Sequence, residues 1–443
     1  MGTLVQGNDG ALYGLTVFGG DSGGGTAFKV NCDGSGFTIL HAFLWYRDGE
    51  NPHGGLLQAT NGNLYGETMY SGGHGVGTLF TLNPDGSHFA VIHSFGAGAS
   101  DGAYPVSGVL VQGRDGALYG TTAHGGTNNQ GIVFKINLDG GSYAVLHTFA
   151  ADDGYGLAPD AGVIQASDGF LYGTTPQGGT NGCGTVYKLS TNGSGYSIIH
   201  IFGLSGDVGH NPYCALVQGA DGALYGTTGG GGDHYEGTVF RLNPDGTDYS
   251  VIYSFNESGP DPHTPQAGLV QGTDGYLYGT GYGGGSAGSG AVFTINTNGA
   301  DFAVLYSFVE SYGSSPSATL IFGQDGALYG TTLSGGSDYS GTVFRLAPPA
   351  RPQVGMPSFF PDGSFRFSLI APAGKLCRID ISTNLADWNT LTNVTSGTNA
   401  VQVIDNSVTT FTRRFYRASY SPSTLIGICC RQPSFCLQHL KFA

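Results

Sequence analysis

The tripeptide Leu-Tyr-Gly occurs seven times in this chain, and its near-constant spacing constrains the fold more than any other feature. The intervals between successive tyrosines run from 51 to 54 residues, at Tyr13, Tyr65, Tyr119, Tyr172, Tyr225, Tyr278 and Tyr329. Such a regular period indicates tandem copies of one structural unit. The fold must therefore be one that adds a similar unit about every 50 residues.

Each copy contains four short segments rich in Val, Ile, Leu, Tyr, Phe and Thr, which is the composition of β-strands. In the fifth copy they begin at Ala215, Leu224, Gly237 and Tyr249. Asp-Gly or Asn-Gly pairs separate the first segment from the second and the third from the fourth. These pairs predict tight hairpins in which both central residues take positive φ. Each unit is therefore expected to be a four-stranded antiparallel meander without helices.

Seven such meanders predict an all-β fold, a seven-bladed β-propeller over residues 1–348, because a closed ring buries both faces of every sheet. A β-solenoid is the rival architecture, but its repeats are typically shorter. The seventh unit stops after its third segment, Gly341–Leu346, which gives 27 strands, one fewer than seven complete blades need. We hypothesise that the chain is a shortened form of a secreted protein, whose upstream segment would supply both the missing strand and a signal peptide.

The composition changes after the last repeat. Residues 349–355 are rich in proline and are expected to form a stiff linker. Residues 356–421 contain alternating strand segments and predict a small β-sandwich, in which Trp388 is interpreted as packing rather than as a sugar platform. Residues 422–443 contain three cysteines and have no assigned role.

Composition and charge exclude several classes of protein. The 80 glycines lack a period of three, which excludes collagen, and the aromatic content of 12% is too high for a disordered chain. No apolar run is long enough for a transmembrane helix. The net charge of −15 argues against a nucleic-acid partner, because phosphate binding needs a basic face. The cysteines lack zinc-ligand spacing, and we expect a monomer.

Strand direction alternates within a blade, so the two hairpins of every unit lie on one face of the ring. We call this end the hairpin face. The loops between second and third strands and the links between blades lie at the opposite end, the link face. Their length and content vary between repeats, and binding residues usually lie on variable loops held by a rigid scaffold. The link face is therefore the expected functional surface.

An aspartate recurs in the links, four to six residues after the last phenylalanine of each blade. These residues are candidate Ca²⁺ ligands, because carboxylates in flexible loops suit that cation: Asp48, Asp101, Asp153, Asp207 and Asp261. Alternatively, each carboxylate accepts hydrogen bonds from backbone N–H groups and shapes its loop. No other cofactor is indicated.

Histidines occupy two kinds of position. Four lie in fourth strands, at His41, His93, His147 and His200, where two further repeats carry Tyr253 and Tyr306. The replacement by tyrosine favours an aromatic layer between blades over a ring of ligands. Histidines in the loops could line a central pocket together with Asp207 or Asp261: His53, His74, His124, His210, His234 and His263.

The repeat resembles the GloVer family, tandem Gly-, Leu- and Val-rich units of secreted bacterial proteins with diverse C-terminal anchors. The matching motifs are Gly-Leu-Val-Gln-Gly, Asp-Gly-Ala-Leu-Tyr-Gly-Thr-Thr, the Gly-Gly loop and Gly-Thr-Val-Phe, which recur over residues 1–348. The segment Ile381–Trp388, with Arg414–Arg417, resembles a C-terminal module common in such proteins. The resemblance implies export and surface display, and it supplies no catalytic residues.

Two functions remain open. The first is an extracellular or surface-displayed binding or structural module that presents its variable loops to a glycan or a protein. The second is a propeller enzyme, either a metal-assisted hydrolase of lactonase or esterase type or a polysaccharide-degrading enzyme. The fold cannot decide between them. A set of unlike polar residues that converge on one face would favour the enzyme, whereas repeats that stay interchangeable would favour the binding module.

Overall fold

The computed structural model of this chain describes residues 2–105, 108–150, 156–203, 209–348, 353–354, 358–359, 364–370, 376–383, 387, 389–395, 401–406, 413–420 and 424–431. The chain divides into two compact units, Met1–Ala347 and Pro348–Ala443. The first contains the repeats and the second follows them, and each is described by itself.

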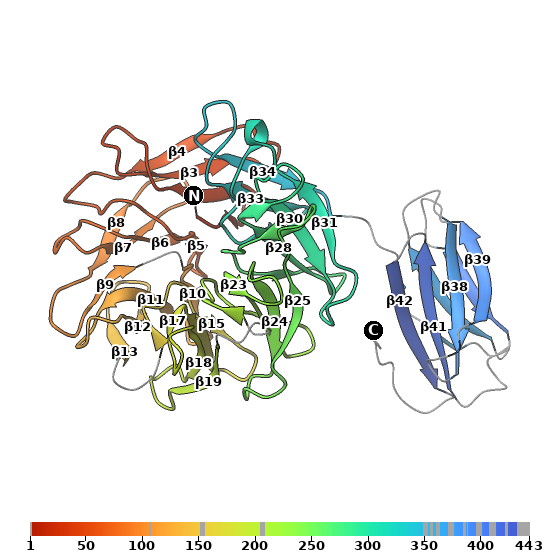
Figure 1. Cartoon of the computed structure of the whole chain (residues 1–443). Helices are drawn as coiled ribbons and strands as arrows, with labels where there is room; N and C mark the ends of the chain where they lie inside the picture. Colours follow the sequence, from red (N-terminus) through yellow and green to blue (C-terminus); the bar gives the residue numbers. More distant parts are fainter. Residues whose placement is uncertain are drawn as a thin grey trace. The chain divides into compact units, whose positions relative to one another are not determined.

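The described residues of the first unit form one blade sheet from each of the seven repeats, in which strands pair in chain order, and three further two-stranded sheets. Figure 1 shows them arranged as the blades of a propeller, with short strands such as β5 and β10 near the centre and β8 and β13 at the periphery. The all-β propeller prediction is confirmed. The blades consist of β1 (Val5–Gln6), β2 (Leu12–Thr16), β3 (Thr26–Val30) and β4 (Thr38–Ala42); β5 (Leu57–Gln58), β6 (Leu64–Thr68), β7 (Thr78–Leu82) and β8 (Ala90–Ser94); β10 (Val111–Gln112), β11 (Leu118–Gly125), β12 (Ile132–Ile136) and β13 (Ala144–Thr148); β15 (Ile164–Gln165), β16 (Leu171–Thr175), β18 (Thr185–Leu189) and β19 (Ser197–Ile201); β21 (Val217–Gln218), β22 (Leu224–Thr228), β24 (Thr238–Leu242) and β25 (Ser250–Ser254); β27 (Val270–Gln271), β28 (Leu277–Gly281), β30 (Ala291–Ile295) and β31 (Ala303–Ser307); and β32 (Ile321–Phe322), β33 (Leu328–Thr332) and β34 (Thr342–Leu346).

The ring closes through contacts between its last and first blades. Tyr329 and Ala327 of the seventh blade share a hydrophobic cluster with Leu4, Leu12 and Phe28 of the first. A glutamine clasp also joins neighbouring blades, in which the Oε1 of the inner-strand glutamine accepts a hydrogen bond from a backbone N–H of the adjacent hairpin. The clasp at the closure runs from the Gln324 N–H to Gln6 Oε1 over 2.7 Å. The inner-strand glutamine therefore has a structural role at six of the seven junctions between blades. At the remaining junction, between the sixth and seventh blades, Phe322 takes its place.

The hairpin between the first two strands of a blade is wider than the Asp-Gly pair predicts. In the first blade Gln6 pairs with Leu12, so five residues form the connection. Gly10 has a φ of +82°, but Asp9 does not share the positive φ expected for a two-residue turn. Instead, the carboxylate of Asp9 accepts hydrogen bonds from the Ala11 N–H at 3.1 Å and from the Tyr13 hydroxyl at 2.8 Å. The expectation of positive φ at both positions is wrong, because the aspartate acts through its side chain.

Short accessory strands extend the blades at the link face. They are β9 (Gly102–Pro105), β14 (Gly156–Leu157), β17 (Gln177–Gly178), β20 (Gly209–His210), β23 (Gly230–Gly231), β26 (Pro262–His263) and β29 (Gly283–Gly284). Among the described residues of the links, a 3₁₀ helix, η2 (Glu310–Tyr312), lies before the seventh blade, where no helix was expected. Among the described residues, no helix combines the length and the apolar character needed to cross a membrane.

The fourth-strand histidines form the aromatic layer favoured by the sequence. Each ring stacks on an aromatic ring of the next blade, as His147 does on Tyr196 with a centroid distance of 3.6 Å. His200 stacks on Tyr249 at 3.7 Å, and Tyr253 stacks on Phe302 at 3.9 Å. Burial lowers the pKa of His147 and of His200 to about 4. These histidines are neutral packing groups at neutral pH.

The second unit consists of two four-stranded antiparallel sheets, which share a core that includes Phe367, Ile379, Val403 and Tyr416. The predicted linker, 349–355, contributes β35, and the predicted tail, 422–443, contributes β42, so both segments hold strands of this unit. Trp388 lies outside the described residues. The strands are β35 (Gln353–Val354), β36 (Ser358–Phe359), β37 (Phe365–Ile370), β38 (Leu376–Ser382), β39 (Asn389–Thr395), β40 (Val401–Asp405), β41 (Arg413–Tyr420) and β42 (Thr424–Arg431).

Candidate functional site

The six links between blades share a turn, and in the five links whose next residue is described this turn brings one side chain to the centre of the ring. The residue before the link proline has a positive φ of 49° to 57°, which is unusual for a non-glycine residue and more so before proline: Asn51, Tyr104, Ala158, Asn211, Thr264 and Ser315. Its N–H donates a hydrogen bond of 2.8 to 3.0 Å to a carbonyl of the preceding blade in all six links. The contact with the preceding blade stabilises this strained turn.

The proline of the turn packs against a glycine at the start of the preceding blade's third strand. A Cβ added to Gly237, for example, would lie 2.8 Å from Pro265 Cδ and 2.4 Å from the Thr228 carbonyl oxygen. Similar close approaches recur at five other links, at Gly25, Gly77, Gly131, Gly184 and Gly290. The glycine at the start of each of these third strands therefore lets the link turn approach the blade.

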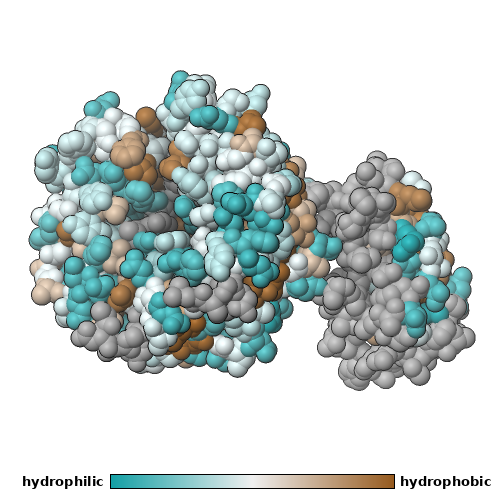
Figure 2. Space-filling view, viewed as in Figure 1, coloured by the Kyte–Doolittle hydropathy of each residue, from teal (hydrophilic) through white to brown (hydrophobic). Residues whose placement is uncertain are grey.

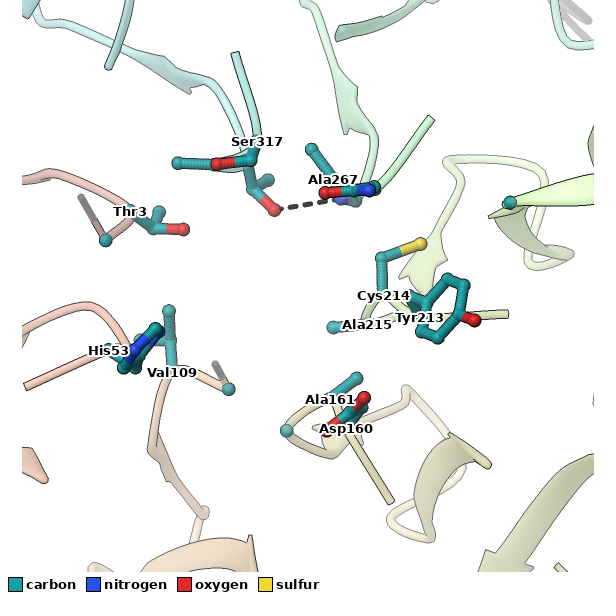
Figure 3. A pocket seen from close by; sticks show the side chains of 18 of the residues that line it. Thr3, His53, Val109, Asp160, Ala161, Tyr213, Cys214, Ala215, Ala267 and Ser317 are labelled. Atoms are coloured by element: carbon teal, nitrogen blue, oxygen red, sulfur yellow. Dashed lines mark hydrogen bonds between the residues drawn. The ribbon is translucent and has the colours of Figure 1, made fainter. Parts of the chain in front are cut away.

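The residue after the proline faces a central cavity of about 810 Å³. Five of these residues are described, and all line the cavity although no two are alike: His53, Asp160, Tyr213, Gln266 and Ser317. We call this set the polar ring. Figure 3 shows His53, Asp160, Tyr213 and Ser317 spread around the opening, each from a different blade. The volume is in the range of small-molecule sites.

Below the polar ring, small residues and backbone groups line the cavity. A Cβ on Gly162 would lie 2.5 Å from the carbonyl oxygen of Val109, so neighbouring blades meet here through their backbones. The Thr319 hydroxyl accepts a hydrogen bond from the Gly268 N–H at 3.0 Å, which is drawn as a dashed line in Figure 3. These contacts hold the inner strands at fixed spacing, so the polar ring stands on a rigid base.

The fifth blade differs from the others where the second strand ends. Its Gly229 and Gly230 both lack side chains, whereas the third blade has Ala123 and His124 at the same positions. A Cβ on Gly229 would lie 2.9 Å from the ring of Tyr213, and one on Gly230 would lie 2.3 Å from the ring of His210. The ring of Tyr213 therefore lies against the peptide backbone, and 39% of the residue is exposed.

The electrostatic character of the cavity is set by few groups. Burial raises the pKa of Asp160, with a smaller opposing effect from His124. Desolvation by the surrounding protein lowers the pKa of His53. None of the described residues that line the cavity is Lys or Arg. The described lining residues thus offer several hydrogen-bonding groups and one carboxyl group, without a Lys or Arg side chain.

Three of the five aspartates proposed as Ca²⁺ ligands are described, and they bond to aromatic side chains of the outer strands. Asp48 Oδ2 lies 3.2 Å from His41 Nε2. Asp101 Oδ1 accepts a hydrogen bond of 2.5 Å from the Tyr143 hydroxyl, and the Tyr253 hydroxyl donates one of 2.8 Å to Asp261. Asp153 and Asp207 lie outside the described residues. Within the described ranges no three His, Cys, Asp or Glu side chains group as a metal site, and the Ca²⁺ assignment stays a prediction.

Of the loop histidines, His53 and His210 line the cavity. His263 instead lies 3.4 Å from the Glu236 carboxylate, measured from its Nδ1. Four members of the polar ring were not among the site residues predicted from the sequence: Asp160, Tyr213, Gln266 and Ser317. A signal for them exists, because the residue after each link proline differs between repeats that are otherwise similar.

Comparison with solved structures concerns the fold alone. A fungal alcohol oxidase of the AA5 family in complex with copper is 11% identical, with a TM-score of 0.50, over 94% of this chain and 93% of that one. A putative 6-phosphogluconolactonase from Bacteroides uniformis is 13% identical, with a TM-score of 0.45, over 89% and 100%. TolB from Acinetobacter baumannii is 10% identical, with a TM-score of 0.40, over 81% and 76%. No curated protein matches the sequence.

The family comparison concerns the repeat itself. The model described as the Gloeobacter/Verrucomicrobia repeat matches residues 1–165 and 158–373, which together cover the propeller. This match confirms the family resemblance found in the sequence motifs. The chain therefore belongs to the Gloeobacter/Verrucomicrobia repeat family.

Proposed function

We propose that this propeller is an extracellular binding module whose central cavity holds the end of a neutral glycan. The observation that carries the proposal is the polar ring, in which one structural position bears a different polar side chain in each of five repeats. If the repeats served only to build the ring, this position would not need five different kinds of side chain. From the sequence we expected such a set to favour an enzyme, but within the described ranges no three His, Cys, Asp or Glu side chains group together. We therefore assign the unlike groups to recognition of an asymmetric ligand.

The chemistry of the cavity supports a neutral polyhydroxylated ligand. Gln266, Ser317 and the hydroxyl of Tyr213 can each donate and accept hydrogen bonds, and Asp160 adds a carboxyl group. Since no described lining residue is cationic and the chain carries a net charge of −15, phosphate or carboxylate ligands would be repelled. Figure 2 shows hydrophilic residues over much of the ring in that view, with hydrophobic residues in separate patches rather than one continuous surface.

Tyr213 supplies a surface against which the apolar face of a sugar ring can pack. Its ring is supported from behind by the backbone at Gly229. We therefore assign the first sugar contact to the fifth blade and the hydrogen bonds to the neighbouring blades. The extracellular location is part of the proposal and rests on the resemblance to secreted proteins.

The test is binding of the full chain to an array of neutral glycans, followed by titration of the best ligand. Asp160→Asn, Gln266→Ala and Ser317→Ala should each weaken binding at least fivefold, and the triple variant should abolish it. Ala220→Ser, on an exposed loop of the hairpin face, is the control and should bind like the wild type. Equal binding by the triple variant would disprove the assignment of the site.

The role of Tyr213 has a sharper test, since Gly229→Ala adds one methyl group behind its ring. The third blade carries Ala123 at this position, so the backbone accepts alanine there. We expect Gly229→Ala to displace the ring and weaken glycan binding about tenfold, with a melting temperature close to that of the wild type. Unchanged binding would remove Tyr213 from the site and leave the rest of the polar ring in place.

One observation favours an enzyme as a second candidate. The raised pKa of Asp160 lets its carboxyl group keep a proton at higher pH, as a general acid in glycan cleavage must. Release of reducing ends from a bound glycan, lost in Asp160→Asn, would support this function. Binding without any release of products would leave the binding module as the function.

A further inference from the structure

The seventh blade differs from the other six because its described residues form three strands, so β34 lies at the outer edge. Val343, the second residue of β34, is 38% exposed. The corresponding residues of the six other blades are 0% exposed, because a fourth strand covers them: Ala27, Leu79, Val133, Val186, Val239 and Val292. The outer edge of β34 therefore presents apolar side chains and a row of backbone hydrogen-bonding groups.

Both neighbouring blades hold aromatic rings that face this edge without the contacts their counterparts make. Phe37 of the first blade is 60% exposed, whereas its counterpart Phe89 is stacked under His41 at 3.7 Å. Tyr306 of the sixth blade is 38% exposed, whereas Tyr253 of the fifth stacks on Phe302 at 3.9 Å. In the repeat pattern, the missing partners of Phe37 and Tyr306 belong to one strand, the fourth strand of the seventh blade.

A glycine of the first blade marks the same gap. In five blades, a Cβ added to the glycine of the hairpin between third and fourth strands would lie 2.3 to 2.7 Å from a carbonyl oxygen in the preceding blade's fourth strand. These glycines are Gly86, Gly140, Gly193, Gly246 and Gly299. At Gly34, the corresponding residue of the first blade, nothing lies within 4 Å. The space is thus bounded on three sides by groups shaped for a strand.

We infer that β34 is a docking site for one extended segment with the fourth-strand pattern of this same repeat. The segment pairs antiparallel with β34, as fourth strands do in the other blades. Its first aromatic residue packs against Tyr306, its His or Tyr stacks on Phe37, and its final Phe reaches Phe28. The six fourth strands already present define this pattern, as in Tyr249-Ser-Val-Ile-Tyr-Ser-Phe255. This inference is independent of the glycan proposal.

The first experiment uses a labelled synthetic peptide with the sequence of residues 248–256, added to the full chain. Fluorescence anisotropy should show saturable binding, and hydrogen exchange at Val343–Leu346 should slow at least tenfold. A peptide with serine in place of both tyrosines should bind at least tenfold more weakly. The protein variants Phe37→Ser and Tyr306→Ser should weaken binding similarly, whereas Phe18→Ser, at a 72% exposed residue outside this gap, should not.

The second experiment supplies the strand within the chain. Leu4 and Leu269 occupy the same repeat position, so a copy of residues 249–265 placed directly before Met1 brings a fourth strand and its link in register. This variant should melt several degrees higher and should no longer bind the peptide. An unchanged melting temperature together with no peptide binding at 1 mM would overturn the inference.

Two other results would also overturn it. Slow exchange, in the free protein, of those β34 amides that do not bond to β33 would show that another part of the chain already covers this edge. A concentration-dependent dimer that Val343→Lys dissolves would show that a second copy is the occupant, rather than a fourth-strand segment.

Discussion

The two faces of the propeller are built from the same repeats, yet they differ in how much the repeats agree. On the hairpin face nearly every blade has the same contacts, such as the hydrogen bond from the Tyr225 hydroxyl to Asp221 at 2.7 Å and that from Tyr329 to Asp325 at 2.9 Å. On the link face the backbone of the turn is just as regular, but the side chain after the proline changes from blade to blade. Regular geometry thus occurs with uniform chemistry at one end and with varied chemistry at the other.

This difference shows which positions hold the ring together and which are available for recognition. A side chain that bonds to its own or a neighbouring blade is constrained by that partner in every repeat. A side chain that faces the cavity has no such partner among the blades, so each repeat can carry a different one. The contrast predicts that hairpin-face substitutions change stability and polar-ring substitutions change binding.

The largest effect is expected for the glycine that supports a link turn. Gly237→Ala places a Cβ 2.4 Å from the Thr228 carbonyl oxygen at a φ of +100°, and we expect a loss of about 3 kcal/mol in unfolding free energy. Gly222→Ala on the hairpin face is the matched control, because its φ is +85° but nothing lies within 4 Å. It should cost about 1 kcal/mol. Chemical denaturation measures the unfolding free energy of both variants. Equal losses in the two variants would show that the link turn adds no steric constraint at Gly237.

The next effect depends on pH. In the folded protein the pKa values of His147 and His200 are lowered to about 4, so between pH 6.5 and 4 the unfolded chain binds protons that the folded chain does not. Stability is therefore lost as the pH falls through this window, by about 1 kcal/mol per histidine at pH 5 after allowance for partial exposure. The fifth and sixth blades carry tyrosine at this position. The double variant His147→Tyr, His200→Tyr should therefore not lose this stability as the pH falls. Parallel stability curves for variant and wild type between pH 7 and 5 would contradict the assignment.

A smaller effect is expected on the hairpin face. Asp221→Ala removes the acceptor for the Tyr225 hydroxyl and for the Ala223 N–H, and should cost about 1 kcal/mol. Tyr225→Phe removes only the first of these bonds and should cost less. Urea denaturation of the two variants separates the contributions of the two hydrogen bonds. An unchanged unfolding free energy in Asp221→Ala would mean that the repeated aspartate has no structural role.

The smallest effect on stability is expected in the polar ring. Ser317→Ala should change the unfolding free energy by less than about 0.5 kcal/mol, because the side chain faces the cavity. The same variant should nevertheless weaken glycan binding. A large loss of stability would show that this position holds the ring together and would remove the distinction between the faces.

The sequence predicted the propeller because period, strand composition and turn residues all recur together. It also predicted that the fourth-strand histidines pack, since tyrosine replaces them in two repeats. It did not predict the hairpin conformation, because the aspartate at Asp9 acts through a hydrogen bond to Tyr13 rather than through its backbone. The Ca²⁺ prediction was made from recurring carboxylates in flexible loops and stays a prediction. The sequence did not reveal that Asp101 lies beside Tyr143 of the next blade.

The sequence by itself determined the repeat, its strands and the end of the ring at which variation gathers, because these properties are local and recur every 50 residues or so. Only the tertiary structure decided which variable residues meet. His53 and Ser317 are far apart along the chain, and they face one cavity because closure of the ring brings every link turn to the same axis. The open edge at β34 likewise became visible only when Phe37 and Tyr306 were seen on its two sides. The sequence of these two residues follows the repeat, so it does not reveal that their partners are missing.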